Sequence, residues 1–130
     1  MKIMVCYTGS TSSRHALELA IRHAKSFQAT LYLVGSMEKG TTAELDVINK
    51  IKTALEAAEE DVKKEGIHCE TRLLVRGFTP YEDLVQFAKE ENIDEIVIGI
   101  RKRSKTGKLI FGSTAQYIIL NAHCPVVTVK

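Results

Sequence analysis

Apolar and polar residues are arranged in two alternating patterns along this chain. Five short runs of strand-like composition are bounded by turn residues and span positions 3–7, 30–34, 68–75, 95–99 and 125–129. Between them, apolar side chains recur at helical spacing, as at Leu17, Ala20 and Ala24. The pattern predicts strands and helices in strict alternation, with a strand at each end.

The expected helices carry recognisable start and stop signals. Thr79 and Glu82 form a capping box around Pro80, which suits the first helical position. Gly66 is placed to end the long second helix, and the last helix is expected from residues 112–113 to about 120. Hydroxyl residues at 8–13 precede the first helix and suit its cap, and residues 35–42 are expected to form a loop. The apolar positions expected to face the core are Leu17, Ala20, Ile21, Ala24 and Phe27 in the first helix, and Leu45, Ile48, Ile51, Leu55, Ala58 and Val62 in the second.

This alternation indicates an α/β fold with one parallel sheet, right-handed crossovers and helices on both faces. Residues 96–98 form an unbroken apolar run, as in a strand covered on both sides, whereas residues 68–75 are more polar, as in an edge strand. No internal repeat, low-complexity segment or linker interrupts the pattern. We therefore expect a single domain over residues 1–130.

The amino-acid composition is close to that of an average globular protein and indicates no particular function. The 130 residues are 45% hydrophobic and 26% charged, with a net charge of +2, so no global charge favours nucleic acid or membrane. Cys6, Cys69 and Cys124 are widely spaced and odd in number, which is typical of buried thiols in a reducing compartment. Neither a signal peptide nor an apolar run of membrane-spanning length is found, so the expected location is the cytoplasm.

Two loops have a composition that suits a ligand, and ligands of open parallel sheets bind at the carboxyl ends of strands. They are residues 8–13 and residues 99–113. Gly112 and Ser113 open a helix, whose free N–H groups attract phosphate; the alternative is an ordinary glycine turn with a serine cap. The cationic run in the second loop is either a phosphate clamp or a solvated segment. It contains Arg101, Lys102, Arg103, Lys105 and Lys108.

Known catalytic and phosphate-loop patterns are not matched. Residues 35–40 have the glycine spacing of a P-loop, but Thr41 stands where lysine is required. After Gly107 and Lys108, Leu109 replaces the serine or threonine that would hold the metal. His123 adjoins Cys124, but adjacency on a turn is no evidence of catalysis, and none of the other histidines lies near a plausible nucleophile in sequence. No catalytic residue is therefore assigned, and no metal site is expected.

The chain resembles the universal stress protein family over nearly its whole length. Gly99, Gly112 and Ser113 match its signature of Gly, two residues, Gly, nine residues and Gly-Ser/Thr. Segment 8–10 stands where the family has an Asp-Gly-Ser-like turn, and segments 77–80, 94–99 and 124–129 resemble further family segments.

The resemblance implies a strand order of 3-2-1-4-5 and a fold like that of the adenine nucleotide alpha hydrolases. Members of the family either bind ATP or AMP, with Mg²⁺ if the ligand is ATP, or bind no nucleotide, and many are homodimers. In a binding member the resemblance places Ser36 against the adenine edge through its backbone. Residues 126–129 are expected to form an uncovered apolar edge strand, so we expect a homodimer through this C-terminal strand. The candidate binding residues are Cys6, Tyr7, Thr8, Ser36, Gly99, Lys102, Gly112, Ser113 and Thr114.

The sequence departs from the family's nucleotide-binding pattern at two positions. Thr8 replaces the acidic residue of the first turn, and Lys102 replaces the second glycine of the signature. Three functions remain open: a nucleotide-binding regulatory module of the stress response with an unknown protein partner, a dimeric stress protein with a vestigial pocket, or a slow ATP hydrolase.

Overall fold

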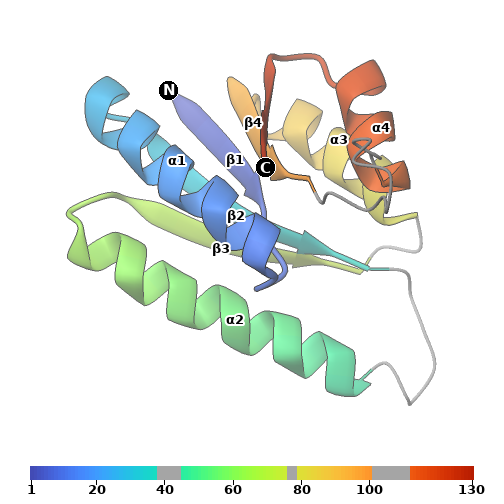
Figure 1. Ribbon diagram of the computed structural model, residues 1–130, viewed down its shortest axis with the longest axis horizontal. Helices are drawn as coiled ribbons and strands as arrows, with labels where there is room; N and C mark the ends of the chain where they lie inside the picture. Colours follow the sequence, from blue (N-terminus) through green and yellow to red (C-terminus); the bar gives the residue numbers. More distant parts are fainter. Residues whose placement is uncertain (38–44, 76–78, 101–111) are drawn as a thin grey trace.

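In the computed structural model, five strands form one parallel sheet (Figure 1). The structure describes residues 1–37, 45–75, 79–100 and 112–130. The strands are β1 (Lys2–Cys6), β2 (Thr30–Ser36), β3 (Cys69–Leu74), β4 (Glu95–Gly99) and β5 (Val126–Val129). Their order in the sheet is β3-β2-β1-β4-β5, as expected, so β3 and β5 form its two edges.

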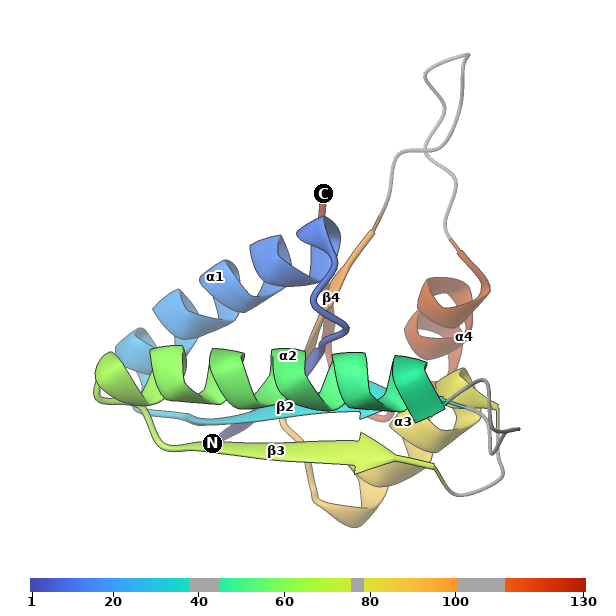
Figure 2. The ribbon, with the colours of Figure 1, turned by 90° about the horizontal axis from the view of Figure 1, so that it is seen from below.

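Four helices cover the two faces of this sheet in pairs. Helices α1 (Thr11–Phe27) and α2 (Leu45–Lys64) lie on one face, and α3 (Pro80–Glu90) and α4 (Ser113–Asn121) on the other (Figures 1 and 2). The alternation along β1 matches this arrangement, because Ile3 and Val5 join the core cluster on the α1 side while Met4 joins the cluster on the α3 side. All three side chains are fully buried. The predicted three-layer α/β architecture is confirmed.

The helix ends follow the predicted local chemistry. The Thr79 hydroxyl accepts a hydrogen bond from the Glu82 N–H at 3.3 Å, which is the N-cap half of the predicted capping box, and it donates to the Glu82 carboxylate at 2.8 Å. Ser10 caps α1 by accepting from the N–H of Ser13. Gly66 follows the end of α2 with a φ of 79°, a left-handed conformation that glycine adopts without steric cost.

Three details of the sequence-based prediction were wrong. Strand β2 runs through Ser36, so Gly35 and Ser36 belong to the strand and not to the following loop; residues 38–44 lie outside the described part. Phe27 and Leu45 are exposed, at 55% and 53% of their surface. Phe27 is the last residue of α1 and Leu45 the first of α2, so helical spacing alone did not decide their burial.

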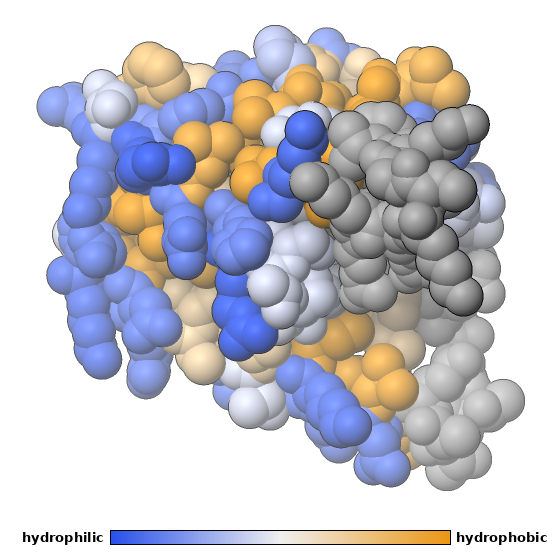
Figure 3. All heavy atoms as spheres, viewed as in Figure 1, coloured by the Kyte–Doolittle hydropathy of each residue, from blue (hydrophilic) through white to orange (hydrophobic). Residues whose placement is uncertain are grey.

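A cavity, described below, lies at the end of the sheet where the parallel strands have their carboxyl ends. On the face shown in Figure 3, hydrophilic residues cover the outer side of α1, and hydrophobic residues are visible toward β5.

None of the described helices is long and apolar enough to cross a membrane.

Candidate functional site

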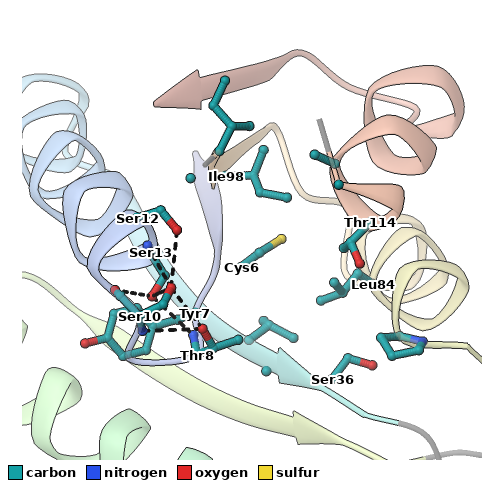
Figure 4. A pocket seen from close by; sticks show the side chains of 17 residues that line it. Cys6, Tyr7, Thr8, Ser10, Ser12, Ser13, Ser36, Leu84, Ile98 and Thr114 are labelled. Carbon is teal, nitrogen blue, oxygen red and sulfur yellow. Dashed lines mark hydrogen bonds between the residues drawn. The ribbon is translucent and has the colours of Figure 1, made fainter. Parts of the chain in front are cut away.

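A cavity of about 280 Å³ opens at the carboxyl ends of β1, β2 and β4 (Figure 4). Helix α1 borders it on one side, and α3 and α4 border it on the other. Its described lining consists of Cys6, Tyr7, Thr8, Ser10, Ser12, Ser13, Val34, Gly35, Ser36, Pro80, Leu84, Ile98, Gly99, Ile100, Gly112, Thr114 and Ala115. Because strand order places β1 between β2 and β4, this is the position where open parallel sheets bind ligands.

One wall of the cavity is a cluster of hydroxyl groups at the start of α1. The Ser10 hydroxyl oxygen lies 3.2 Å from that of Thr8, 3.3 Å from that of Ser12 and 3.1 Å from that of Ser13. It also accepts from the Ser13 N–H, and the Thr8 N–H donates to the Ser13 hydroxyl at 3.4 Å. These side chains therefore satisfy one another and help to cap the helix.

The opposite wall contains a helix start that has no such cap. Gly112 is the N-cap of α4 and makes no side-chain capping bond. Among the described residues, no atom beyond its immediate chain neighbours lies within 4 Å of the position that a β-carbon would take on Gly112. Thr114 lines the cavity in the first turn, whereas Ser113 is exposed and does not line it. The positive end of the α4 dipole thus borders open space beside the cavity, which is a favourable place for an anion.

At the end of β2, no backbone hydrogen bond from Ser36 to β1 is found among the described residues. The last residue of β2 paired with β1 is Val34, whose carbonyl accepts from the Tyr7 N–H at 3.0 Å, whereas the Met37 N–H donates to Leu74 in β3. Since alternate residues of a strand direct their backbone groups to opposite neighbours, those of Ser36 point toward the β1 side. β1 has already ended there, so this edge is open to a ligand.

The described walls of the cavity carry no charge near neutral pH. Burial raises the pKa of the Cys6 thiol to about 12, which keeps the thiol protonated. Burial also raises the pKa of Tyr7, in spite of the opposing charge of Arg14. Within residues 1–37, 45–75, 79–100 and 112–130, no three His, Cys, Asp or Glu side chains come together in a way that suits a metal ion.

Seven of the nine candidate residues from the sequence line this one cavity. They are Cys6, Tyr7, Thr8, Ser36, Gly99, Gly112 and Thr114. Lys102 lies outside the described residues, as does the cationic run around it. Sequence reasoning missed the apolar wall from Pro80, Leu84 and Ile98, because these residues read as ordinary core positions. It noted the hydroxyl-rich segment 8–13 but did not select Ser10, Ser12 and Ser13.

The sheet order and the cavity at the topological switch point define the class of protein: this is an α/β domain with the nucleotide-binding fold. The model of the universal stress protein family matches residues 1–130. The chain belongs to this family.

Relatives with solved structures and known sequences agree with this assignment. A universal stress protein from Archaeoglobus fulgidus is 40% identical, with a TM-score of 0.89 and coverage of 99% of this chain and 97% of that one. Another structure of a universal stress protein from the same organism, in complex with dAMP, is 33% identical with a TM-score of 0.83, covering 99% of this chain and 96% of that one. A universal stress protein of Thermus aquaticus is 32% identical over 98% of this chain and 97% of its own length.

Proposed function

We propose that this protein is an adenine-nucleotide-binding regulatory module of the stress response, which holds AMP or ATP in the cavity between α1 and α4. The observation that carries the proposal is the pairing of two complementary ends in one cavity. One end is the uncapped start of α4 at Gly112, which suits a phosphate. The other is the open backbone edge of Ser36, which suits a base.

The width of the cavity across the sheet is on the scale of a nucleotide. Ser36 closes β2 and Gly99 closes β4, with β1 between them. Two strand spacings amount to about 10 Å, which is the scale of a nucleoside with its first phosphate. Apolar residues such as Leu84 and Ile98 line the space between and suit the faces of a purine.

A relative supports the choice of ligand. The Archaeoglobus fulgidus protein that is 33% identical to this chain was solved in complex with dAMP. In our proposal Cys6, Tyr7 and Thr8 lie beside the nucleoside, and Gly112 and Thr114 lie beside the phosphate. Ser113 at the start of α4 and Lys102, which lies outside the described residues, remain proposed phosphate contacts, and Mg²⁺ would accompany ATP.

One observation favours the vestigial pocket as a second candidate. The Thr8 hydroxyl oxygen is engaged with Ser10, since it lies 3.2 Å from the Ser10 hydroxyl and accepts from the Ser10 N–H at 3.4 Å. It also lacks the charge of the acidic residue that the family's nucleotide-binding members have at this position. In this alternative the protein acts through its dimer and its protein partner in the cytoplasm, without a nucleotide.

Calorimetric titration of the purified protein with AMP and ATP, each with and without Mg²⁺, tests the proposal. We expect saturable binding of at least one of the two nucleotides. Mass spectrometry of gently purified protein should also detect co-purifying adenine nucleotide. If neither nucleotide binds at millimolar concentration, the vestigial pocket is the correct description. Steady ADP release that is lost in pocket variants would instead indicate a slow hydrolase.

A further inference from the structure

The side-chain oxygen of Ser36 is a buried polar atom without a hydrogen-bond partner. It has less than 1 Å² of accessible surface, and no partner is found for it among the described residues. A buried hydroxyl without a partner loses its hydration and gains nothing in return, which is unfavourable. A buried polar atom of this kind in a native structure requires an explanation, and a ligand that supplies the missing partner is one.

The other serines of the cavity do not share this property. Ser10, Ser12 and Ser13 lie on the α1 side, where the Ser10 hydroxyl hydrogen-bonds to that of Ser12 at 3.3 Å and to that of Ser13 at 3.1 Å. Ser36 lies across the cavity from them, on the side of Leu84 and Thr114 (Figure 4). The orphan hydroxyl is therefore a local feature of the end of β2 and not a general feature of the cavity.

The position of Ser36 connects this hydroxyl with the base end of the ligand. Ser36 lines the cavity, and rotation about its single side-chain torsion moves the oxygen between three staggered positions at little cost. Its backbone groups point to the same β1 side that we assign to the base. A hydroxyl both donates and accepts, so it fits a ring nitrogen or an exocyclic amino group equally well.

We infer that the Ser36 hydroxyl hydrogen-bonds directly to the polar edge of the bound base and makes Ser36 a specificity-determining residue. The inference rests on the proposed nucleotide site and adds a side-chain contact to the backbone contact at the same residue. In the unliganded protein the hydroxyl contributes nothing to stability, and it gains its partner when the nucleotide binds.

The test compares Ser36→Ala with wild type in two measurements on the full-length protein. Calorimetric titration with AMP and with adenosine measures affinity, and thermal unfolding without ligand measures stability. We expect Ser36→Ala to bind AMP three- to tenfold more weakly, the loss of one hydrogen bond. Adenosine should lose the same factor, because the contact lies at the base and not at the phosphate.

The stability measurement separates a ligand contact from a structural role. Ser36→Ala should unfold at the wild-type temperature or above it, since it removes an unsatisfied buried group. Ser10→Ala is the matched control: it makes the same chemical change at a hydroxyl that caps α1 and should lower the melting temperature by roughly 4 °C.

Three results would overturn the inference. Ser36→Ala could bind AMP as tightly as wild type, or it could lose AMP affinity while adenosine affinity stays unchanged. It could also unfold at a clearly lower temperature, which would give the hydroxyl a structural role. A wild-type protein that binds neither AMP nor adenosine would overturn the proposed function as well, so the two failures are distinguishable.

Discussion

A β-carbon at Gly99 would lie 2.2 Å from the carbonyl oxygen of Ser12, far inside any permitted contact. The end of β4 and the first turn of α1 therefore touch through backbone atoms, and this contact forms part of the cavity wall. At Gly112, in contrast, a β-carbon would have no atom of the described residues within 4 Å beyond the immediate chain neighbours. The two signature glycines thus have different roles: Gly99 permits close packing, whereas Gly112 leaves space open beside a helix start.

The first prediction follows from the close approach at Gly99. Gly99→Ala should lower the free energy of unfolding by about 1–3 kcal/mol, because the backbone of Ser12 must move to admit the methyl group. Gly112→Ala is the control and should cost less than about 1 kcal/mol, the usual effect at an N-cap without a side-chain bond. Urea unfolding of the three proteins measures both values. Equal stability of Gly99→Ala and wild type would contradict the packing role.

The second prediction concerns the open space at Gly112. Gly112→Val should fill the approach to the first-turn N–H groups of α4 and abolish stabilisation by AMP. A ligand at 100 times its dissociation constant adds about 2.7 kcal/mol, so the loss is measurable as a thermal shift. Adenosine, which lacks the phosphate, should stabilise variant and wild type alike. An undiminished AMP shift in Gly112→Val would place the phosphate elsewhere.

The third prediction concerns assembly through β5, the edge strand formed by the last residues. The carbonyls of Pro125 and Val129 accept from β4, so the Thr128 N–H points to the open edge of the sheet. We expect a homodimer in which this edge pairs with its copy. Thr128→Pro removes the outward donor without touching the β4 pairing and should shift the protein toward monomer in analytical ultracentrifugation.

A control is needed because β5 also contributes to the core. Val127 packs against the buried cluster that contains α1, so a charge at this position would disturb the fold as well as the edge. The Thr128→Pro variant should keep the wild-type far-ultraviolet circular dichroism spectrum. A wild-type protein that sediments as a monomer at tens of micromolar would remove the basis for this dimer.

The fourth prediction concerns the contact between α2 and β3. The Glu59 carboxylate accepts hydrogen bonds from Lys63 at 2.8 Å and from Thr71 at 3.0 Å, and the bond from Lys63 contributes most to lowering the pKa of Glu59 below its ordinary 4.5. Because the pKa of Glu59 is lower in the folded than in the unfolded protein, the ionised carboxylate stabilises the fold at pH values above the unfolded pKa. This stabilisation is lost as the pH falls through the folded-state pKa.

Glu59→Gln should therefore be less stable than wild type at pH 7, by about 0.5–1 kcal/mol. The difference should shrink as the pH falls below 4.5 and the wild-type carboxylate takes up its proton. Denaturant titrations at a series of pH values measure the gap. A difference that stays constant down to pH 3 would assign the effect to packing instead of charge.

The sequence by itself determined the order and type of the elements. The strand-like runs and the helical spacing between them are local patterns that each segment carries alone. The capping box at Thr79 and Glu82 involves atoms three residues apart, so its geometry is fixed as soon as the helix forms. The polar third strand was correctly placed at an edge, because an edge strand needs less apolar surface than a central one.

Only the tertiary structure decided what the cavity is made of. The contact between Gly99 and Ser12 joins residues far apart in the chain, and it exists because β4 pairs with β1 directly beneath the start of α1. The open backbone edge at Ser36 depends in the same way on where β1 ends relative to β2. These properties arise from strand register and from the packing of helices on the sheet, which no single segment determines. The alternation of strands and helices, in contrast, follows from the local pattern of each segment.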